Sequence, residues 1–125
     1  MAHSVLVVDD RLEVVDMLST FVKADERLTL AGVARDGVEA VARSECGCPD
    51  AIILDVEMPR MDGLQALPIL RRACPDGVIV IYSSNPDGAG NARQLGADAV
   101  ADKAEDPLGL IDLVADLCRS GATTP

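Results

Sequence analysis

Five short runs of apolar residues alternate along the chain with longer segments in which apolar residues recur every three or four positions. The short runs have the length and composition of buried strands, and the longer segments have the spacing of amphipathic helices. Strands separated by helices favour a parallel sheet that is covered on both faces. The 125 residues therefore predict one α/β domain, a doubly wound (βα)5 three-layer sandwich, with strands at Ser4–Val8, Leu28–Ala34, Ala51–Leu54, Val78–Tyr82 and Ala99–Ala101.

Local signals define one helix start and two irregular segments. Asp36, three residues before Glu39, resembles a capping box and predicts the start of the second helix. Pro68 lies inside the third helical pattern and should delay or kink that helix, because proline lacks an N–H and its ring clashes with the preceding turn. Gly88 and Gly90 lower the helix propensity of the fourth segment, so we expect little regular helix there.

The charge balance excludes some classes of partner. Eleven basic and 21 acidic residues give a net charge of −10, which argues against direct binding to a nucleic-acid backbone. An acidic domain suits a cation or a partner with a basic face. No apolar stretch approaches the roughly 20 residues that span a bilayer, and the N-terminus lacks an export signal. We therefore expect a cytoplasmic protein without a membrane partner.

Four cysteines add a second expectation about the compartment. Without an export signal or a paired CxxC motif, Cys46, Cys48, Cys74 and Cys118 are predicted to be reduced thiols of a cytosolic protein. A zinc site is the alternative, but the single residue between Cys46 and Cys48 is unlike the loops that hold zinc.

Polar residues follow four of the five predicted strands, where functional groups gather in a doubly wound sheet. If the strand order is 2-1-3-4-5, the groups that follow strands one, three, four and five meet at one small basin. Carboxylates this close repel one another, and a divalent cation relieves the repulsion; oxygen ligands alone favour Mg²⁺. The alternative is that each acid only forms a turn. The groups are Asp9 and Asp10, Asp55 and Glu57, Ser83 and Ser84, and Lys103.

These residues carry a resemblance to the receiver domain of two-component response regulators. The resemblance covers essentially the whole chain and implies the flavodoxin-like sheet order given above, with a receiver domain at 1–120 and a flexible tail at 121–125. The matching motifs are Val7-Val8-Asp9-Asp10, then Ile53-Leu54-Asp55-Val56-Glu57-Met58-Pro59-Arg60-Met61-Asp62-Gly63, then Val80-Ile81-Tyr82-Ser83-Ser84, and finally Gly96-Ala97-Asp98 followed by Lys103.

The resemblance implies a role for each matching residue. A sensor histidine kinase is the expected donor of a phosphoryl group, and a downstream output domain or protein target is the expected second partner. The chain would catalyse only its own phosphorylation and dephosphorylation, through positioning and charge stabilisation. The implied roles are Asp55 as phosphoacceptor, Asp9, Asp10, Asp55 and the backbone carbonyl of Glu57 as ligands of Mg²⁺, Ser83 turning towards the phosphoryl group, and Lys103 neutralising it.

The sequence also departs from the family pattern. Val100 stands where receivers usually place Tyr or Phe, so the usual coupling of a hydroxyl and an aromatic ring is missing. Two other functions stay open. One is a receiver-like module that acts by protein contact without phosphorylation, and the other is a small aspartyl-phosphate phosphatase that uses Asp55 as nucleophile.

Overall fold

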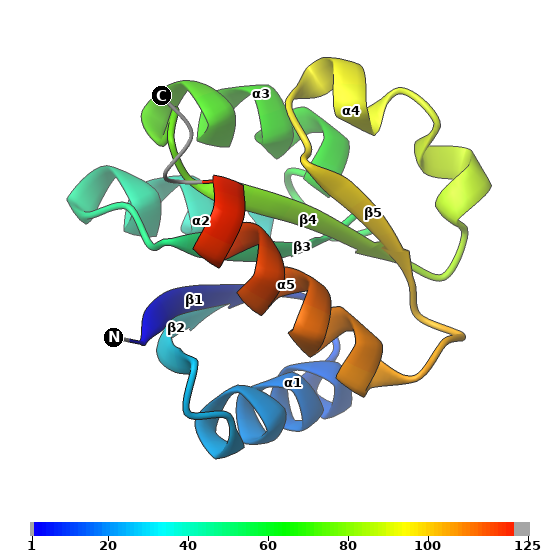
Figure 1. The fold of residues 1–125 in the computed structure, drawn as a ribbon. Coiled ribbons are helices and arrows are strands. Elements are labelled where there is room, and N and C mark those ends of the chain that lie inside the picture. The colour runs from blue at the N-terminus through cyan, green and yellow to red at the C-terminus, as the bar shows by residue number, and fades with distance from the viewer. Residues whose placement is uncertain (1, 122–125) are drawn as a thin grey trace.

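The computed structural model describes residues 2–121 as a five-stranded parallel sheet between two layers of helices (Figure 1). The strand order is β2-β1-β3-β4-β5, which confirms the predicted fold class and order. Residues 122–125 of the predicted tail lie outside the described residues, and Gly121 ends the last helix. The elements are β1 His3–Val8, α1 Leu12–Ala24, β2 Leu28–Ala34, α2 Gly37–Cys46, β3 Ala51–Asp55, α3 Gly63–Ala73, β4 Val78–Ser83, the 3₁₀ turn η1 Pro86–Ala89, α4 Ala92–Leu95, β5 Ala99–Asp102 and α5 Pro107–Gly121.

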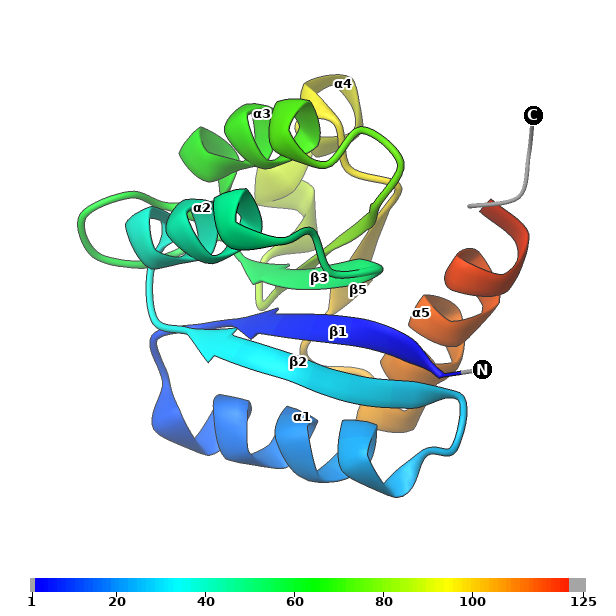
Figure 2. The ribbon, with the colours of Figure 1, turned by 90° about the vertical axis from the view of Figure 1, so that its left-hand side faces the viewer.

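The sheet buries side chains on both faces, and each face belongs to a separate hydrophobic cluster. In β1, Val5 and Val7 pack on the side of α1 and α5, whereas Leu6 and Val8 pack on the side of α2 and α3. Figure 2 shows these two helical layers on opposite sides of the sheet. Because alternate residues of a strand point to opposite faces, a strand buried on both faces must be apolar at every position.

The structure tests the two segments for which the sequence predicted irregular helices, α3 around Pro68 and residues 85–95. Pro68 is expected to delay or kink α3; the helix begins at Gly63 and continues through Pro68, so it is not delayed. Asp62 and Gln65 form a reciprocal capping box at the start of α3, which satisfies exposed N–H groups of its first turn. The weak helix signal of residues 85–95 is confirmed, because only η1 and the four-residue α4 form there.

The expectation that all four cysteines are reduced thiols is wrong for two of them. Cys48 and Cys74 form a disulfide, with their Cα atoms 5.7 Å apart, whereas Cys46 and Cys118 are free. Because the two cysteines are separated by 26 residues along the chain, the sequence does not indicate that they are close. They are close because α2 and α3 lie next to each other on one face of the sheet, which brings together the connections that follow these helices (Figure 2). Among the described residues, no helix is both long and apolar enough to cross a membrane.

Asp36 joins the start of α2 to the loop after β3. One carboxylate oxygen accepts from the backbone N–H of Glu39 at 2.8 Å, and the other accepts from the guanidinium of Arg60, whose φ of 65° turns the loop. The N–H of Glu39 and the charge of Arg60 hold the pKa of Asp36 below its ordinary value. The side chain of Glu39 accepts from Arg35 rather than from Asp36, so only half of the predicted capping box forms.

Asp36→Ala is expected to lower the free energy of unfolding at pH 7 by about 1–2 kcal/mol, mainly because α2 loses its cap. Asp36→Asn keeps an oxygen for the cap and should recover more than half of this loss. A lowered folded-state pKa means that the ionised carboxylate stabilises the fold above the ordinary pKa, and that this stabilisation is lost as the pH falls through the folded value. Urea unfolding at pH 7 and pH 3 should therefore show a smaller deficit for Asp36→Ala in acid. An equal deficit at both pH values would contradict this role for the charge.

Candidate functional site

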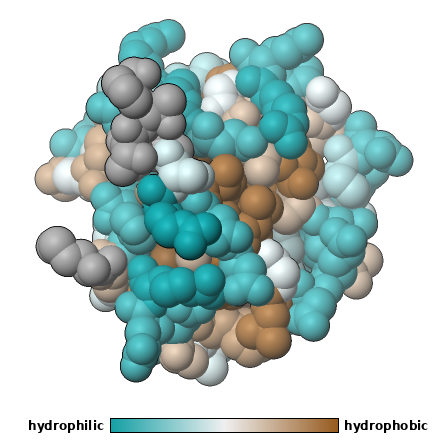
Figure 3. All heavy atoms as spheres, viewed as in Figure 1, coloured by the Kyte–Doolittle hydropathy of each residue, from teal (hydrophilic) through white to brown (hydrophobic). Residues whose placement is uncertain are grey.

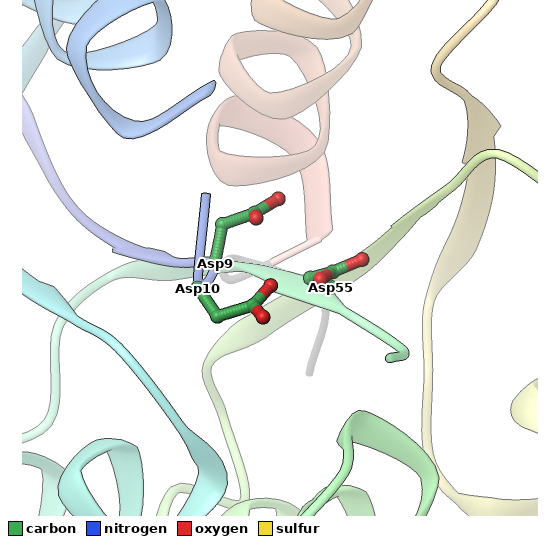
Figure 4. A group of neighbouring side chains, drawn as sticks. All are labelled: Asp9, Asp10 and Asp55. Atoms are coloured by element: carbon green, nitrogen blue, oxygen red, sulfur yellow. The ribbon is translucent and has the colours of Figure 1, made fainter. Parts of the chain in front are cut away.

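The carboxyl ends of the strands carry a cluster of three aspartates. Asp9 and Asp10 follow β1, and Asp55 is the last residue of the adjacent β3. One oxygen from each carboxylate lies within 4.8 Å of the others, and Figure 4 shows Asp10 directed towards the side on which Asp55 lies. The predicted convergence of these acids is therefore present in the fold.

Lys103, in the connection after β5, reaches into this cluster. Its Nζ donates to Asp9 Oδ2 at 2.8 Å and to Asp55 Oδ1 at 3.0 Å. The side chains of Asp9 and Asp55 are only 2% and 8% exposed, so both ion pairs are largely shielded from water. Asp10 is partly exposed and forms no ion pair among the described residues. The cluster thus contains three carboxylates and one ammonium group, which pairs with two of them.

Burial and crowding change the acidity of the groups in the cluster. Burial raises the pKa of Asp55, and the negative charges of Asp9 and Asp10 raise it further, while Lys103 opposes the shift. Burial disfavours the charge of Lys103, but its hydrogen bonds to Asp9 and Asp55 outweigh this and raise the pKa of Lys103. A buried carboxylate that lacks enough positive charge is an arrangement that enzymes and switches use at reactive sites.

Ser83, Glu57 and Lys103 line the same small cavity as Asp55. This cavity has a volume of about 30 Å³, which is small but sufficient to hold a water molecule. The hydroxyl oxygen of Ser83 accepts from the N–H of Asn85 at 2.9 Å, which fixes its position at the end of β4. The side chain of Glu57 is exposed, so its carboxylate does not join the buried group.

Three residues for which the sequence predicted no role also belong to this end of the sheet. Arg11 lines the small cavity, and its backbone N–H donates to Asp9 at 2.9 Å. The ring of Tyr82, which ends the predicted strand Val78–Tyr82, has its centroid 5.6 Å from the Nζ of Lys103. The N–H of Gly63 donates to the carbonyl of Val56 at 2.7 Å. A glycine eight residues after the acid that ends β3 is the one signal that could have indicated this close approach.

The three aspartates fit a magnesium ion by the chemistry of their donors. All three supply carboxylate oxygens, which Mg²⁺ prefers, and the group contains no thiolate or imidazole that would favour zinc. Asp10 is partly exposed, which leaves room for the water molecules that Mg²⁺ usually retains.

Comparison with known proteins agrees with the geometry. The family model of the response regulator receiver domain matches residues 5–115. A protein-glutamate methylesterase/protein-glutamine glutaminase of Halalkalibacterium halodurans is 37% identical over 117 residues, which cover 90% of this chain, and one of Maricaulis maris is 46% identical over 86 residues, which cover 66%. The alignments cover only 34% and 21% of those two proteins, so the chain spans about a third of their length or less.

Solved structures give the same result. The response regulator domain of CheB from Thermotoga maritima superposes with a TM-score of 0.82 at 26% identity, over 100% of this chain and 99% of that one. A CheX–CheY–BeF3–Mg complex from Borrelia burgdorferi superposes with a TM-score of 0.80 at 25% identity, over 92% of this chain and 88% of that one. The family model covers most of the chain and the sheet order is that of a receiver, so this chain belongs to the response regulator receiver domain family.

Proposed function

We propose that this chain is a phosphorylatable receiver that takes a phosphoryl group from a histidine kinase on Asp55 and then changes its signalling surface. The observation that carries the proposal is the contact of Lys103 with both Asp9 and Asp55, beside an Asp10 without a cationic partner. This cluster has a deficit of positive charge and an acceptor carboxylate at its edge. The chain would catalyse only its own phosphorylation and dephosphorylation.

Each residue of the cluster has a defined task in such a transfer. An oxygen of Asp55 attacks the phosphorus atom, a new P–O bond forms, and the bond from phosphorus to the donor breaks. The ammonium of Lys103, already 3.0 Å from Asp55, neutralises charge on the transferred group. The hydroxyl of Ser83 lines the same cavity and can donate to a phosphoryl oxygen. Asp9, Asp10, Asp55 and the carbonyl of Glu57 would hold Mg²⁺, which supplies charge stabilisation when it is bound.

The surface between α5 and β5 is where we expect the signal to be read. A cavity of about 360 Å³ lies there, and its lining includes the apolar residues Val100, Leu110 and Leu113 and several acidic residues. Figure 3 shows hydrophobic side chains in a band beside α5 on a face that is otherwise largely polar. Because Val100 leaves this region without an aromatic ring, a downstream output domain or protein target would meet a cavity rather than a ring.

The experiment that tests the proposal is a mass measurement after incubation with acetyl phosphate. Wild type should gain the mass of one phosphoryl group with Mg²⁺ and none with a chelator, and Asp55→Asn should gain none in either condition. Equal labelling of Asp55→Asn would contradict Asp55 as acceptor. No labelling of wild type would favour the module that acts by protein contact alone, and sustained hydrolysis of a generic phosphate ester would favour the phosphatase.

Asp10→Asn is expected to stabilise the metal-free protein by about 1–2 kcal/mol. It removes the charge of Asp10, which is the one of the three crowded carboxylates that Lys103 does not contact. Melting curves in a chelator should show a shift of several degrees upward. Wild type should gain stability with millimolar Mg²⁺ and Asp10→Asn much less, because the variant loses a ligand. Asp16→Asn, at an exposed position of α1, is the control for a simple reduction of net charge. A lower melting temperature for Asp10→Asn in chelator would show that the acid is structural.

A further inference from the structure

The disulfide lies at the end of the sheet opposite the aspartate cluster. Cys48 comes just before β3 and Cys74 just before β4, at the amino ends of these strands, whereas Asp9 and Asp55 lie at the carboxyl ends. In Figure 2, β1 points to the left and the connections from α2 to β3 and from α3 to β4 lie to the right. The proposed phosphorylation chemistry therefore does not use these cysteines.

The two sulfur-bearing residues differ in their access to solvent. Cys48 is exposed, whereas Cys74 is only 2% exposed. Two surface cavities, of about 590 and 300 Å³, share Cys48 and Pro49 in their linings, and Cys74 lines only the smaller one. The Cys48–Pro49 segment thus lies between two surface cavities, and an attacking reagent can reach Cys48 from solvent.

Cys74 is joined to a network of backbone contacts at the end of α3. Its carbonyl accepts from the guanidinium of Arg71 at 3.2 Å, and the same guanidinium donates to the carbonyls of Gly77 and Gly96 at 2.7 and 2.9 Å. Arg71 also pairs with Asp98 at 2.8 Å. These contacts hold the end of α3 in place without the sulfur bridge. Opening the bridge therefore does not require the sheet to separate.

We propose that Cys48–Cys74 is a reversible thiol–disulfide exchange site that a dithiol reductant opens by attack at Cys48 in the folded protein. Exposed disulfides are the ones that exchange most readily. The direction of attack follows from access, since Cys48 is exposed and lines two cavities, whereas Cys74 is only 2% exposed and lines one.

The exchange balances in two steps. A thiolate of the reductant attacks the Sγ of Cys48, a mixed disulfide forms there, and the electron pair of the broken bond leaves on the Sγ of Cys74, which takes up a proton. The second thiolate of the reductant attacks its own sulfur in the mixed disulfide and releases Cys48. The dithiol is oxidised to a disulfide, and the protein gains two electrons and two protons.

The other two cysteines serve as internal references. Cys46 is exposed and free, so alkylating reagents should modify it in either state. Cys118 is buried, and burial raises the pKa of its thiol to about 11, with Asp50 contributing to the shift. The native protein should therefore show one reactive thiol before reduction, and exposure of Cys48 should add a second after it.

The first test counts thiols by mass after an acid quench and alkylation in denaturant. After incubation of the folded protein with oxidised glutathione, two cysteines should be either alkylated or joined to glutathione; after dithiothreitol, four should be alkylated, with full return on transfer between the two. Reduction should lower the melting temperature by about 10 °C, because a loop with a sequence separation of 26 is released. Cys48→Ser should show no response to dithiothreitol, and Cys46→Ser should respond like wild type. Four alkylated cysteines under both conditions, or reduction only in urea, would overturn the proposal.

The second test examines the direction of attack in two variants that also carry Cys46→Ser. With Cys74→Ser, the single exposed thiol of Cys48 should react with iodoacetamide in the native state at the rate of a free peptide thiol. With Cys48→Ser, Cys74 should react at least about tenfold more slowly, because it is only 2% exposed. Equal rates in the two variants would contradict attack at Cys48. Neither test depends on phosphorylation, so the proposed function can fail without affecting this result.

Discussion

Lys103→Met is expected to lower the free energy of unfolding of the metal-free protein by about 3 kcal/mol, because two buried carboxylates lose their common partner. Methionine keeps most of the length of the side chain, so the effect reports the charge more than the packing. The Nζ of Lys103 is 2.8 Å from Asp9 and 3.0 Å from Asp55, whose side chains are 2% and 8% exposed. Without the ammonium group, neither carboxylate has another cation within ion-pair distance among the described residues.

Urea unfolding in a chelator measures this loss, and Lys23→Met is the matched control. Lys23 is the only other lysine, and it is exposed at the end of α1. We expect the deficit of Lys103→Met to shrink with millimolar Mg²⁺, if the ion binds the aspartates, and the rate of phosphorylation by acetyl phosphate to fall by about 10²–10³-fold. A variant as stable as wild type in chelator would show that the ion pairs contribute nothing.

The position of the site could be predicted from the sequence, because one rule covers it. Polar residues that follow the strands of a doubly wound sheet meet at one edge, so Asp9, Asp55 and Lys103 had to converge once the strand order was assumed. The pairing within the cluster could not be predicted in the same way. Whether Lys103 contacts Asp9 or Asp10 depends on the side to which each residue points after β1 ends, and sequence spacing does not determine this.

The contacts that the sequence did not indicate are those between elements that are distant along the chain. The bond between Cys48 and Cys74 depends on how α2 and α3 pack, and the ion pair of Arg60 with Asp36 depends on the course of a loop. Pro68 is a case in which tertiary structure overrides a local prediction. Local propensity predicted a delayed or kinked α3, but the capping box at Asp62 and the buried face of α3 let the helix start without delay.

The helix α3 connects the end of the molecule that holds the aspartate cluster with the end that holds the disulfide. It begins at Gly63, against the last residue of β3, and ends beside Cys74, where the disulfide and the contacts of Arg71 hold it. The placement of its first residue therefore bears directly on the geometry of Asp55. A substitution that pushes this residue away should disturb both the stability of the domain and the aspartate cluster.

Gly63→Ala is expected to destabilise the protein by about 3 kcal/mol, because the added Cβ would lie 2.1 Å from the carbonyl oxygen of Asp55. The next contacts are also backbone atoms, of Asp55 and Val56, so no side chain can move aside to make room. Gly109→Ala is the matched control, since it lies in α5 with open space around the new Cβ and should stabilise the protein by up to about 1 kcal/mol. Urea unfolding of both variants should therefore show shifts of opposite sign. If Gly63→Ala also gained stability, steric contact with Asp55 could not be the reason for glycine at this position, and the link between α3 and the aspartate cluster would have to be abandoned.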